Sequence, residues 1–159
     1  MPMPKAMRKT IRWGIGAVGL VVVGAFAATA LEADPEGPPV GACARIEGTA
    51  KAPRYLALDC SSDRATVKVA KVVEEGGKCP TGGAPYSAYV GSATLCLIPN
   101  FVVGGCYRQD RKTGLHKVDC TTAGSIRVAR ASKDPVNCGD DRALSYPEPA
   151  VTFCLSRPA

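Results

Sequence analysis

The chain has 159 residues, and 20 Lys and Arg residues outnumber 14 Asp and Glu residues, for a formal net charge of +6 at pH 7. This length allows one domain or two very small ones. A nucleic-acid partner is not expected, because the basic residues are scattered and no basic motif with interleaved aromatic residues appears.

The N-terminal third begins with a basic segment and an apolar segment. Residues 1–12 carry four positive charges and no acid, and residues 13–31 carry no charge at all. A helix of that length spans ~28 Å, close to the hydrocarbon thickness of a bilayer. The positive charges before it and the acidic residues after it place the N-terminus inside. We therefore expect a cytoplasmic segment (1–12), a transmembrane signal-anchor helix (13–31) and an extracytoplasmic remainder, in a single-pass plasma-membrane protein.

A cleaved signal peptide is the alternative for the same segment. Ala28-Thr29-Ala30 has the small-x-small form of a cleavage site, and cleavage after Ala30 would release a secreted soluble factor. The apolar run is longer than the usual signal-peptide core of about 7 to 15 residues, which favours the anchor. Residues 32–39 follow as an acidic, Pro-rich linker that forms neither helix nor strand.

The rest of the chain contains one four-cysteine unit twice. Cysteines follow one another at steps of 17, 19 and 17 residues in the first copy and 14, 18 and 16 in the second. The motifs Val-Gly-x-Cys, Asp-Cys and Cys-Leu recur in both copies, which indicates a tandem duplication with units at 40–99 and 100–159. The cysteines are Cys43, Cys60, Cys79, Cys96, Cys106, Cys120, Cys138 and Cys154.

Both units are expected to be all-β, with four or five short antiparallel strands each, after the single N-terminal transmembrane helix. The clearest strand is 66–73, which is rich in β-branched residues with partial alternation. The segment 146–149 contains two prolines, which block ladder hydrogen bonds and predict an extended edge. The other expected strands are 43–47, 55–60, 86–90 and 94–98 in the first unit, and 106–109, 115–120, 126–131 and 151–155 in the second.

An even number of cysteines in an exported chain predicts a disulfide framework. If Cys43 opens one strand and Cys60 ends the next antiparallel strand, the two face each other at disulfide distance. Cys106 and Cys120 have the same relation. The remaining cysteines then pair within each unit, as Cys79 with Cys96 and Cys138 with Cys154. Such staples suit units of about 50 to 60 residues, whose hydrophobic cores are marginal.

No catalytic, cofactor or metal site is predicted. The chain has no Cys-x-x-Cys pair, so zinc binding and redox catalysis are not expected. The only histidine, His116, has no serine in a nucleophile-elbow context. Asp59 and Asp119 precede equivalent cysteines in both copies, which raises the hypothesis of paired carboxylates for acid–base chemistry. Such a pair must lie about 5 to 9.5 Å apart across a cleft, and equivalent positions of two repeats have no reason to meet this requirement. We therefore expect each Asp to face solvent or to bond a nearby backbone N–H. The acidic pairs at 74–75 and 140–141 lack the pattern of a calcium loop.

The few aromatic residues are expected to be mostly packing residues, with Phe101 as a plug between the two units. A shared ligand platform is the alternative. The residues concerned are Tyr55, Tyr86, Tyr89, Phe101, Tyr107, Tyr146 and Phe153.

Short motifs follow one another along residues 40–159: Val-Gly-x-Cys at Cys43, Val-Lys-Val-x-x-Val-Val at 67–73, Thr-Leu-Cys-Leu-x-Pro at 94–99 with Asn100-Phe101 directly after it, Val-Asp-Cys at Cys120 and Tyr-Pro-Glu-Pro at 146–149. In these motifs the chain resembles the LppU-type lipoproteins of actinobacteria and, more distantly, the septum-formation-related domain of the same bacteria. The resemblance implies an exported, membrane-attached, disulfide-bonded protein without assigned catalytic residues. A lipobox cysteine is missing, so attachment would be through residues 13–31.

The expected function is therefore binding or scaffolding in the cell envelope, at the wall or division site, by a protein that is not an enzyme. From Val40 onward, 16 Lys and Arg residues face 11 Asp and Glu residues, which favours contact with anionic envelope polymers. Another envelope protein is the second kind of partner considered. An envelope enzyme or enzyme inhibitor is the alternative function, and a cleft with convergent polar groups would favour it.

Overall fold

The computed structural model describes residues 37–158, which belong to one compact unit, Ala33–Ala159. The predicted cytoplasmic segment, the predicted membrane segment and most of the linker lie outside the described residues. Within 37–158, no helix has the length and apolar character needed to cross a bilayer.

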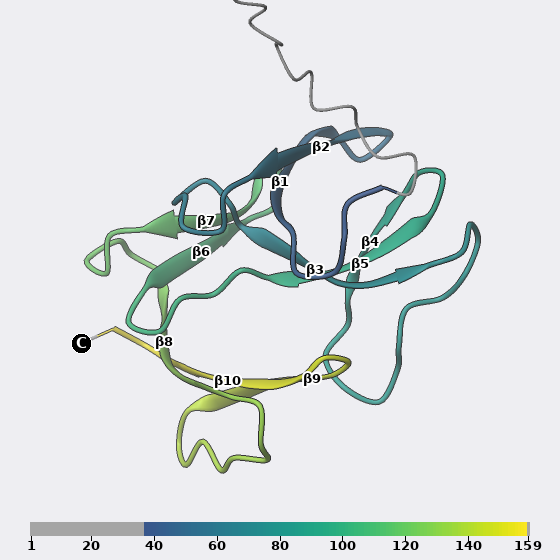
Figure 1. Cartoon of the computed structure of the whole chain (residues 1–159). Coiled ribbons are helices and arrows are strands. Elements are labelled where there is room, and N and C mark those ends of the chain that lie inside the picture. Colours follow the sequence, from purple (N-terminus) through teal and green to yellow (C-terminus); the bar gives the residue numbers. More distant parts are fainter. Residues whose placement is uncertain (1–36, 159) are drawn as a thin grey trace, which may run out of the picture. The chain divides into compact units, whose positions relative to one another are not determined.

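The expected all-β fold is confirmed for the described residues. Ten strands form two five-stranded antiparallel sheets, and each repeat supplies one sheet (Figure 1). The first sheet has the order β2-β1-β3-β5-β4, with β1 at Cys43–Thr49, β2 at Ala52–Leu58, β3 at Val67–Val73, β4 at Ser87–Val90 and β5 at Thr94–Pro99. The second has the order β7-β6-β8-β10-β9, with β6 at Cys106–Asp110, β7 at Gly114–Val118, β8 at Ile126–Ser132, β9 at Arg142–Pro147 and β10 at Ala150–Ser156.

The two sheets repeat one another strand by strand. The first strand of each repeat forms a hairpin with the second and also pairs with the third, through Cys43 beside Lys68 and Cys106 beside Arg127. The register of the third strand with the last shifts at the same place in both copies, where Ala70 and Ala129 are the extra residues. The duplication read from the cysteines therefore extends to topology, register and bulge position.

Strand β9 is the main difference from the expected strands. The two prolines of 146–149 predict an extended edge without naming a paired strand. In the structure, Arg142–Pro147 pairs with β10 along its whole length, down to Pro147 opposite Ala150. The prolines are compatible with this pairing because β9 lies at the edge of its sheet and has only one neighbour.

The four predicted disulfides are present. Cys43–Cys60 and Cys106–Cys120 lock the first hairpin of each repeat, with Cα atoms 5.0 and 5.1 Å apart. Cys79–Cys96 and Cys138–Cys154 tie the long loop before the fourth strand to the last strand, at 5.6 and 5.4 Å. All these Cα separations are typical of disulfides, and every bridge stays within its own repeat.

The hydrophobic core extends across the boundary between the two repeats. One cluster, around Val69, Leu95 and Leu97, belongs to the first sheet. A second cluster combines Ala70 and Ile98 of the first repeat with buried residues of the second, Tyr107, Val128, Tyr146, Phe153 and Leu155. Its central aromatic contacts are made by Phe101, whose ring centroid lies 4.7 Å from that of Tyr107 and 5.2 Å from that of Phe153. The prediction that Phe101 fills the junction between the units is confirmed.

Polar contacts also join the repeats. The hydroxyl of Tyr86 donates to the carbonyl oxygen of Glu148 at 2.7 Å, and the Glu148 carboxylate forms an ion pair with Lys71. A second ion pair joins Lys117 to Asp63. Both pairs have partly exposed partners and contribute little free energy each, so the shared apolar core carries most of the association.

Candidate binding groove and arginine face

A groove of about 580 Å³ lies between the two repeats. We call it the inter-repeat groove. The first repeat lines it mainly with Ile46, Tyr89, Leu97 and Ile98, and the second with Leu115, Ile126, Leu144 and Leu155. Its volume falls in the range of small-molecule sites, about 300 to 1,000 Å³. Duplication therefore produces a concave surface that neither sheet forms alone.

Polar side chains in the groove are few and of restricted type. Among the described residues that line it, Arg142 is the only one with a formal charge. The other polar side chains are those of Thr66, Ser87, Gln109 and Thr113 and the hydroxyls of Tyr89, Tyr107 and Tyr146, and the described lining includes no carboxylate, imidazole, amine or thiol. Apart from the tyrosine hydroxyls, the described lining residues include no side chain that could act as a general acid or base.

The opposite side of the second sheet carries arginines instead. Residues paired across antiparallel strands point to the same side, and successive residues alternate. Arg127 pairs with Cys106 and Arg130 with Cys154, while Arg108 lies two residues after Cys106 on the same strand. We call these three exposed residues, Arg108, Arg127 and Arg130, the arginine face.

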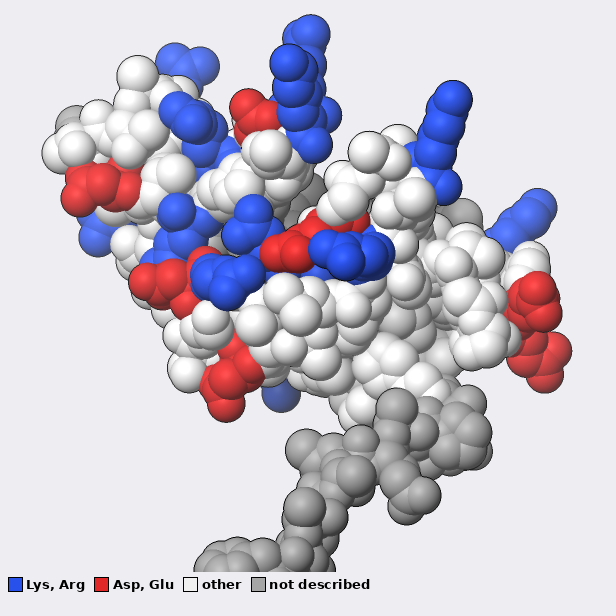
Figure 2. All heavy atoms as spheres, turned by 90° about the horizontal axis from the view of Figure 1, so that it is seen from above, with Lys and Arg blue, Asp and Glu red and all other residues white. Residues whose placement is uncertain are grey.

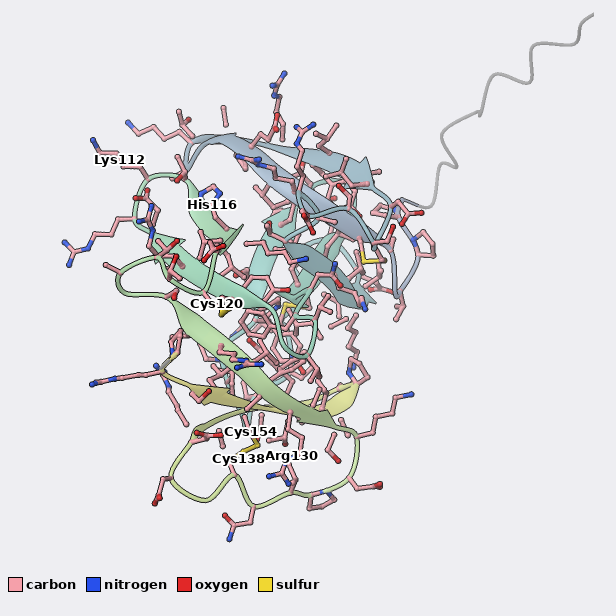
Figure 3. The ribbon with its side chains drawn as sticks, turned by 90° about the vertical axis from the view of Figure 1, so that its left-hand side faces the viewer. Lys112, His116, Cys120, Arg130, Cys138 and Cys154 are labelled. Atoms are coloured by element: carbon pink, nitrogen blue, oxygen red, sulfur yellow. A yellow bond between two sulfur atoms is a disulfide. The ribbon has the colours of Figure 1, made fainter. Side chains whose placement is uncertain are left out.

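The register gives this face its geometry. Arg108 and Arg127 are diagonal neighbours on β6 and β8, so their Cβ atoms are about 7 to 8 Å apart. Arg130 lies further along β8, beside the Cys138–Cys154 bridge (Figure 3). The acid nearest to this group along the chain is Asp110, two residues after Arg108, and its carboxylate accepts the backbone N–H groups of Lys112 and Thr113.

The first repeat has cations at the same three positions, but two of them have acidic partners. Arg45, Lys68 and Lys71 correspond to Arg108, Arg127 and Arg130 by register. Arg45 lies 3.7 Å from Glu47, and Lys71 pairs with Glu148. Within the described residues, none of the three arginines of the second repeat has an acidic partner within ion-pair distance. The two copies thus share the three cation positions, but only in the first copy do acidic side chains pair with cations there, at Arg45 and Lys71.

The charges elsewhere on the surface are mixed. Figure 2 shows Lys and Arg side chains distributed over the face seen from above, with Asp and Glu side chains between them. Part of this mixture is the cluster in which Arg45, Arg54 and Arg64 surround Glu47. In contrast to this cluster, the arginine face has no acidic side chain within ion-pair distance among the described residues.

The residues weighed as catalytic candidates have local structural contacts. His116 lies opposite Arg108 on β7, and its Nε2 is 2.7 Å from Oγ1 of Thr113 near the hairpin turn (Figure 3). Asp59 accepts the hydroxyl and backbone N–H of Ser61 at 2.6 and 2.8 Å. Asp119 accepts the same two groups of Thr121 at the same distances. The expected backbone contact of each Asp is confirmed.

Three exposed turn carboxylates have lowered pKa values. Hydrogen bonds from the hydroxyl and then the backbone N–H of Ser61 lower the pKa of Asp59, and those of Thr121 lower the pKa of Asp119 in the same way. Backbone hydrogen bonds from Lys112 and Thr113 lower the pKa of Asp110, with a smaller effect of Arg108. These shifts come from turn geometry, and they indicate structural carboxylates.

The remaining predictions concern metal sites and aromatic packing. Among residues 37–158, no three His, Cys, Asp or Glu side chains are gathered in a way that could hold a metal ion. Aromatic pairs Tyr55–Tyr89 and Tyr86–Tyr146 pack at centroid distances of 5.7 and 5.1 Å, which supports the packing interpretation. Tyr89 and Tyr146 also line the groove, so part of the predicted platform contributes to a concave surface.

Two groups were missed from the sequence. The position of Arg142 in the groove depends on β9, which was not predicted as a paired strand because of its prolines. The role of Asn100 depends on how the segment between the two repeats folds. Asn100 is buried, and its Nδ2 donates to the carbonyl oxygens of Cys60 and Ala65 at 2.9 Å each. The only signal in the sequence was a polar residue directly after Pro99, at the end of the last strand of the first unit.

Comparisons of the chain with protein-family models, with curated proteins and with solved structures find no significant match.

Proposed function

We propose that the protein is a membrane-anchored, extracytoplasmic binding or scaffolding module of the cell envelope, acting at the cell wall or division site. Residues 13–31 would anchor it, and its partners would be anionic envelope polymers or another envelope protein. The observation that carries the proposal is the arginine face, where three exposed cations lack acidic partners among the described residues.

Arginine is well suited to such contacts. Its planar guanidinium donates two parallel hydrogen bonds to one carboxylate or phosphate group. The Cβ separation of Arg108 and Arg127 allows both side chains to approach a single anionic group, and Arg130 extends the row along β8. Binding of this kind is weak for each group, adds up along a polymer, and weakens with salt.

Catalysis receives less support from the same geometry. The described lining of the inter-repeat groove contains no carboxylate, imidazole or amine that could transfer a proton, and its tyrosine hydroxyls have no such group beside them in the lining. Asp59, Asp119 and His116 make hydrogen bonds within their own turns. An enzyme or enzyme inhibitor would need a different surface. The arginine face instead places three guanidinium groups without ion pairs on one side of one sheet.

The experiment measures binding of the solubilised full-length chain to membrane-free cell walls at low and moderate salt. The triple variant Arg108→Gln, Arg127→Gln, Arg130→Gln should bind on the order of a hundredfold more weakly at low salt, because each of the three cations contributes about 1 kcal/mol near a strongly anionic surface. The matched control is Arg45→Gln, Lys68→Gln, Lys71→Gln, which removes the same charge from the first repeat. An equal loss in both variants would show that net charge alone governs binding, and no loss in either would refute the proposal.

Attachment is tested separately. N-terminal sequencing of the mature protein should find the segment 13–31 retained. A mature N-terminus directly after Ala30 would support the secreted form instead.

A further inference from the structure

The structure contains a second surface that the arginine face does not explain. The inter-repeat groove is mostly apolar, and its aromatic side chains come from both repeats: Tyr89 from the first sheet, Tyr107 and Tyr146 from the second, and Phe101 from the linker between them. A groove of about 580 Å³ with such walls retains water poorly, so an apolar occupant gains free energy by displacing that water.

The charge of the groove lining determines the charge that a bound ligand should carry. Arg142 is the single charged residue among the described lining residues, and it pairs across the ladder with Leu155, which is also part of the lining. Its side chain therefore lies on the groove side of the sheet. A ligand with an anionic end group satisfies this guanidinium, whereas a cationic ligand finds no carboxylate in the lining.

The lack of polar groups also separates an amphiphile from a peptide. A bound peptide brings one backbone donor and one acceptor for nearly every residue, and each loses water on binding. Besides Arg142, the lining offers polar atoms on Thr66, Ser87, Gln109 and Thr113 and the hydroxyls of three tyrosines, Tyr89, Tyr107 and Tyr146. The Tyr107 hydroxyl already accepts the backbone N–H of Val102. An acyl chain brings no such groups and is compatible with these walls.

We propose that the inter-repeat groove binds a single-chain anionic amphiphile, with its acyl chain between the two sheets and its anionic group at Arg142. This site is on the opposite side of the second sheet from the arginine face, since Arg130 pairs with Cys154 and Arg142 pairs with the next residue, Leu155. The two surfaces are therefore independent and can be tested apart.

The test uses the full-length chain in its membranes and a fatty acid that carries a photoactivatable diazirine in its acyl chain. After irradiation, mass spectrometry of the peptides should place the label on segments that line the groove, such as those with Leu97 and Leu115. Unlabelled palmitate should displace the probe about tenfold better than hexadecanol, which has the same chain without the charge.

Two variants test the binding of the acyl chain and the binding of the anionic group separately. Ser87→Trp places a large side chain at an exposed position of the edge strand that lines the groove, and it should reduce labelling about tenfold. Arg142→Gln should abolish the advantage of palmitate over hexadecanol. Arg130→Gln, an arginine of the same sheet on its other side, should leave both quantities unchanged.

Several results would overturn the proposal. Labelling spread over the exposed surface, or labelling unaffected by Ser87→Trp, would show that the groove is not the site. Equal competition by palmitate and hexadecanol would show that the anionic group of the ligand does not contribute to binding. Stronger displacement by an extended peptide than by palmitate would assign the groove to a protein segment.

Melting of the Arg142→Gln protein at the wild-type temperature excludes unfolding as the cause of its effect.

Discussion

The backbone N–H of Ala84 donates to the carbonyl oxygen of Ser145 at 2.7 Å, which joins a loop of the first repeat to the edge strand of the second. The neighbouring Gly83 makes this approach possible. A Cβ atom placed on Gly83 would lie 2.6 Å from the same carbonyl oxygen and 2.9 Å from Cδ of Pro147. The junction between the repeats thus depends on a position where a side chain cannot fit.

We therefore expect Gly83→Ala to weaken the junction between the repeats. The added methyl group must push the loop away from β9, which breaks the Ala84–Ser145 hydrogen bond and costs about 1 to 3 kcal/mol. Denaturant unfolding of the variant measures this loss. The control is Gly91→Ala, where the atoms nearest to an added Cβ would lie 3.9 Å away, and it should change stability by less than about 0.5 kcal/mol. Equal stability of the two variants would contradict the close approach.

Asn100 provides a second prediction. Its side-chain amide bonds the carbonyl oxygens of Cys60 and Ala65 in a buried position, so Asn100→Ala leaves both oxygens without a donor. The expected loss is about 2 to 4 kcal/mol in the free energy of unfolding. Asn137→Ala is the control, because Asn137 is exposed and accepts one backbone N–H from Gly139. A loss of less than about 1 kcal/mol for Asn100→Ala would show that the amide is dispensable.

Two tyrosines differ in whether their hydroxyl has a partner. The Tyr55 hydroxyl is buried and has no hydrogen-bond partner among the residues that the structure describes, and burial raises its pKa. The Tyr107 hydroxyl accepts the N–H of Val102 at 2.9 Å and lies 3.4 Å from the carbonyl oxygen of Asn100. Tyr55→Phe should therefore keep or raise the melting temperature, whereas Tyr107→Phe should cost about 1 to 2 kcal/mol. The reverse order would indicate an unrecognised partner for Tyr55.

The disulfides should dominate stability. Each closes a loop of 14 to 17 residues, worth ~3 kcal/mol in the chain-entropy model, although the four contributions do not add fully. Reduction should unfold the β module or lower its melting temperature strongly. Thermal melts with and without reductant measure this, and non-reducing peptide mapping checks the pairing. A midpoint that moves by only a degree or two would mean that the shared core suffices without the bridges.

The turn carboxylates predict how stability depends on pH. Their pKa values are lower in the folded chain than the ordinary 3.8, so the folded state holds fewer protons than the unfolded state as the pH approaches that value. Their contribution is complete above pH 3.8 and is lost as the pH falls through the lowered values. Asp59→Asn with Asp119→Asn should therefore reduce the slope of melting temperature against pH below about 4. An unchanged slope would assign the acid sensitivity to other groups.

Local signals in the sequence determined most of the fold. Cysteine spacing and the recurring Asp-Cys and Cys-Leu motifs were sufficient to predict the duplication and the four disulfides. Alternation and β-branched content located most strands, because a strand buried on one face needs that pattern. The strand β9 was not recognised as a paired strand, since Pro147 is compatible with pairing only at an edge, and edge position is a property of the whole sheet.

The candidate sites required tertiary structure. Arg108, Arg127 and Arg130 are 19 and three residues apart in sequence. The register of β6 with β8 places the first two on one face, and the bulge in β8 opposite β10 brings Arg130 to the same face. Arg45 and Lys71 have the same positions in the first repeat, yet Glu47 and Glu148 neutralise them, and the contact with Glu148 crosses between the repeats. The sequence by itself determined the repeat and its four disulfides, because these follow from residue type and spacing. Tertiary structure alone decided which cations lack partners and where the two sheets leave a groove, because both depend on residues brought together from distant parts of the chain.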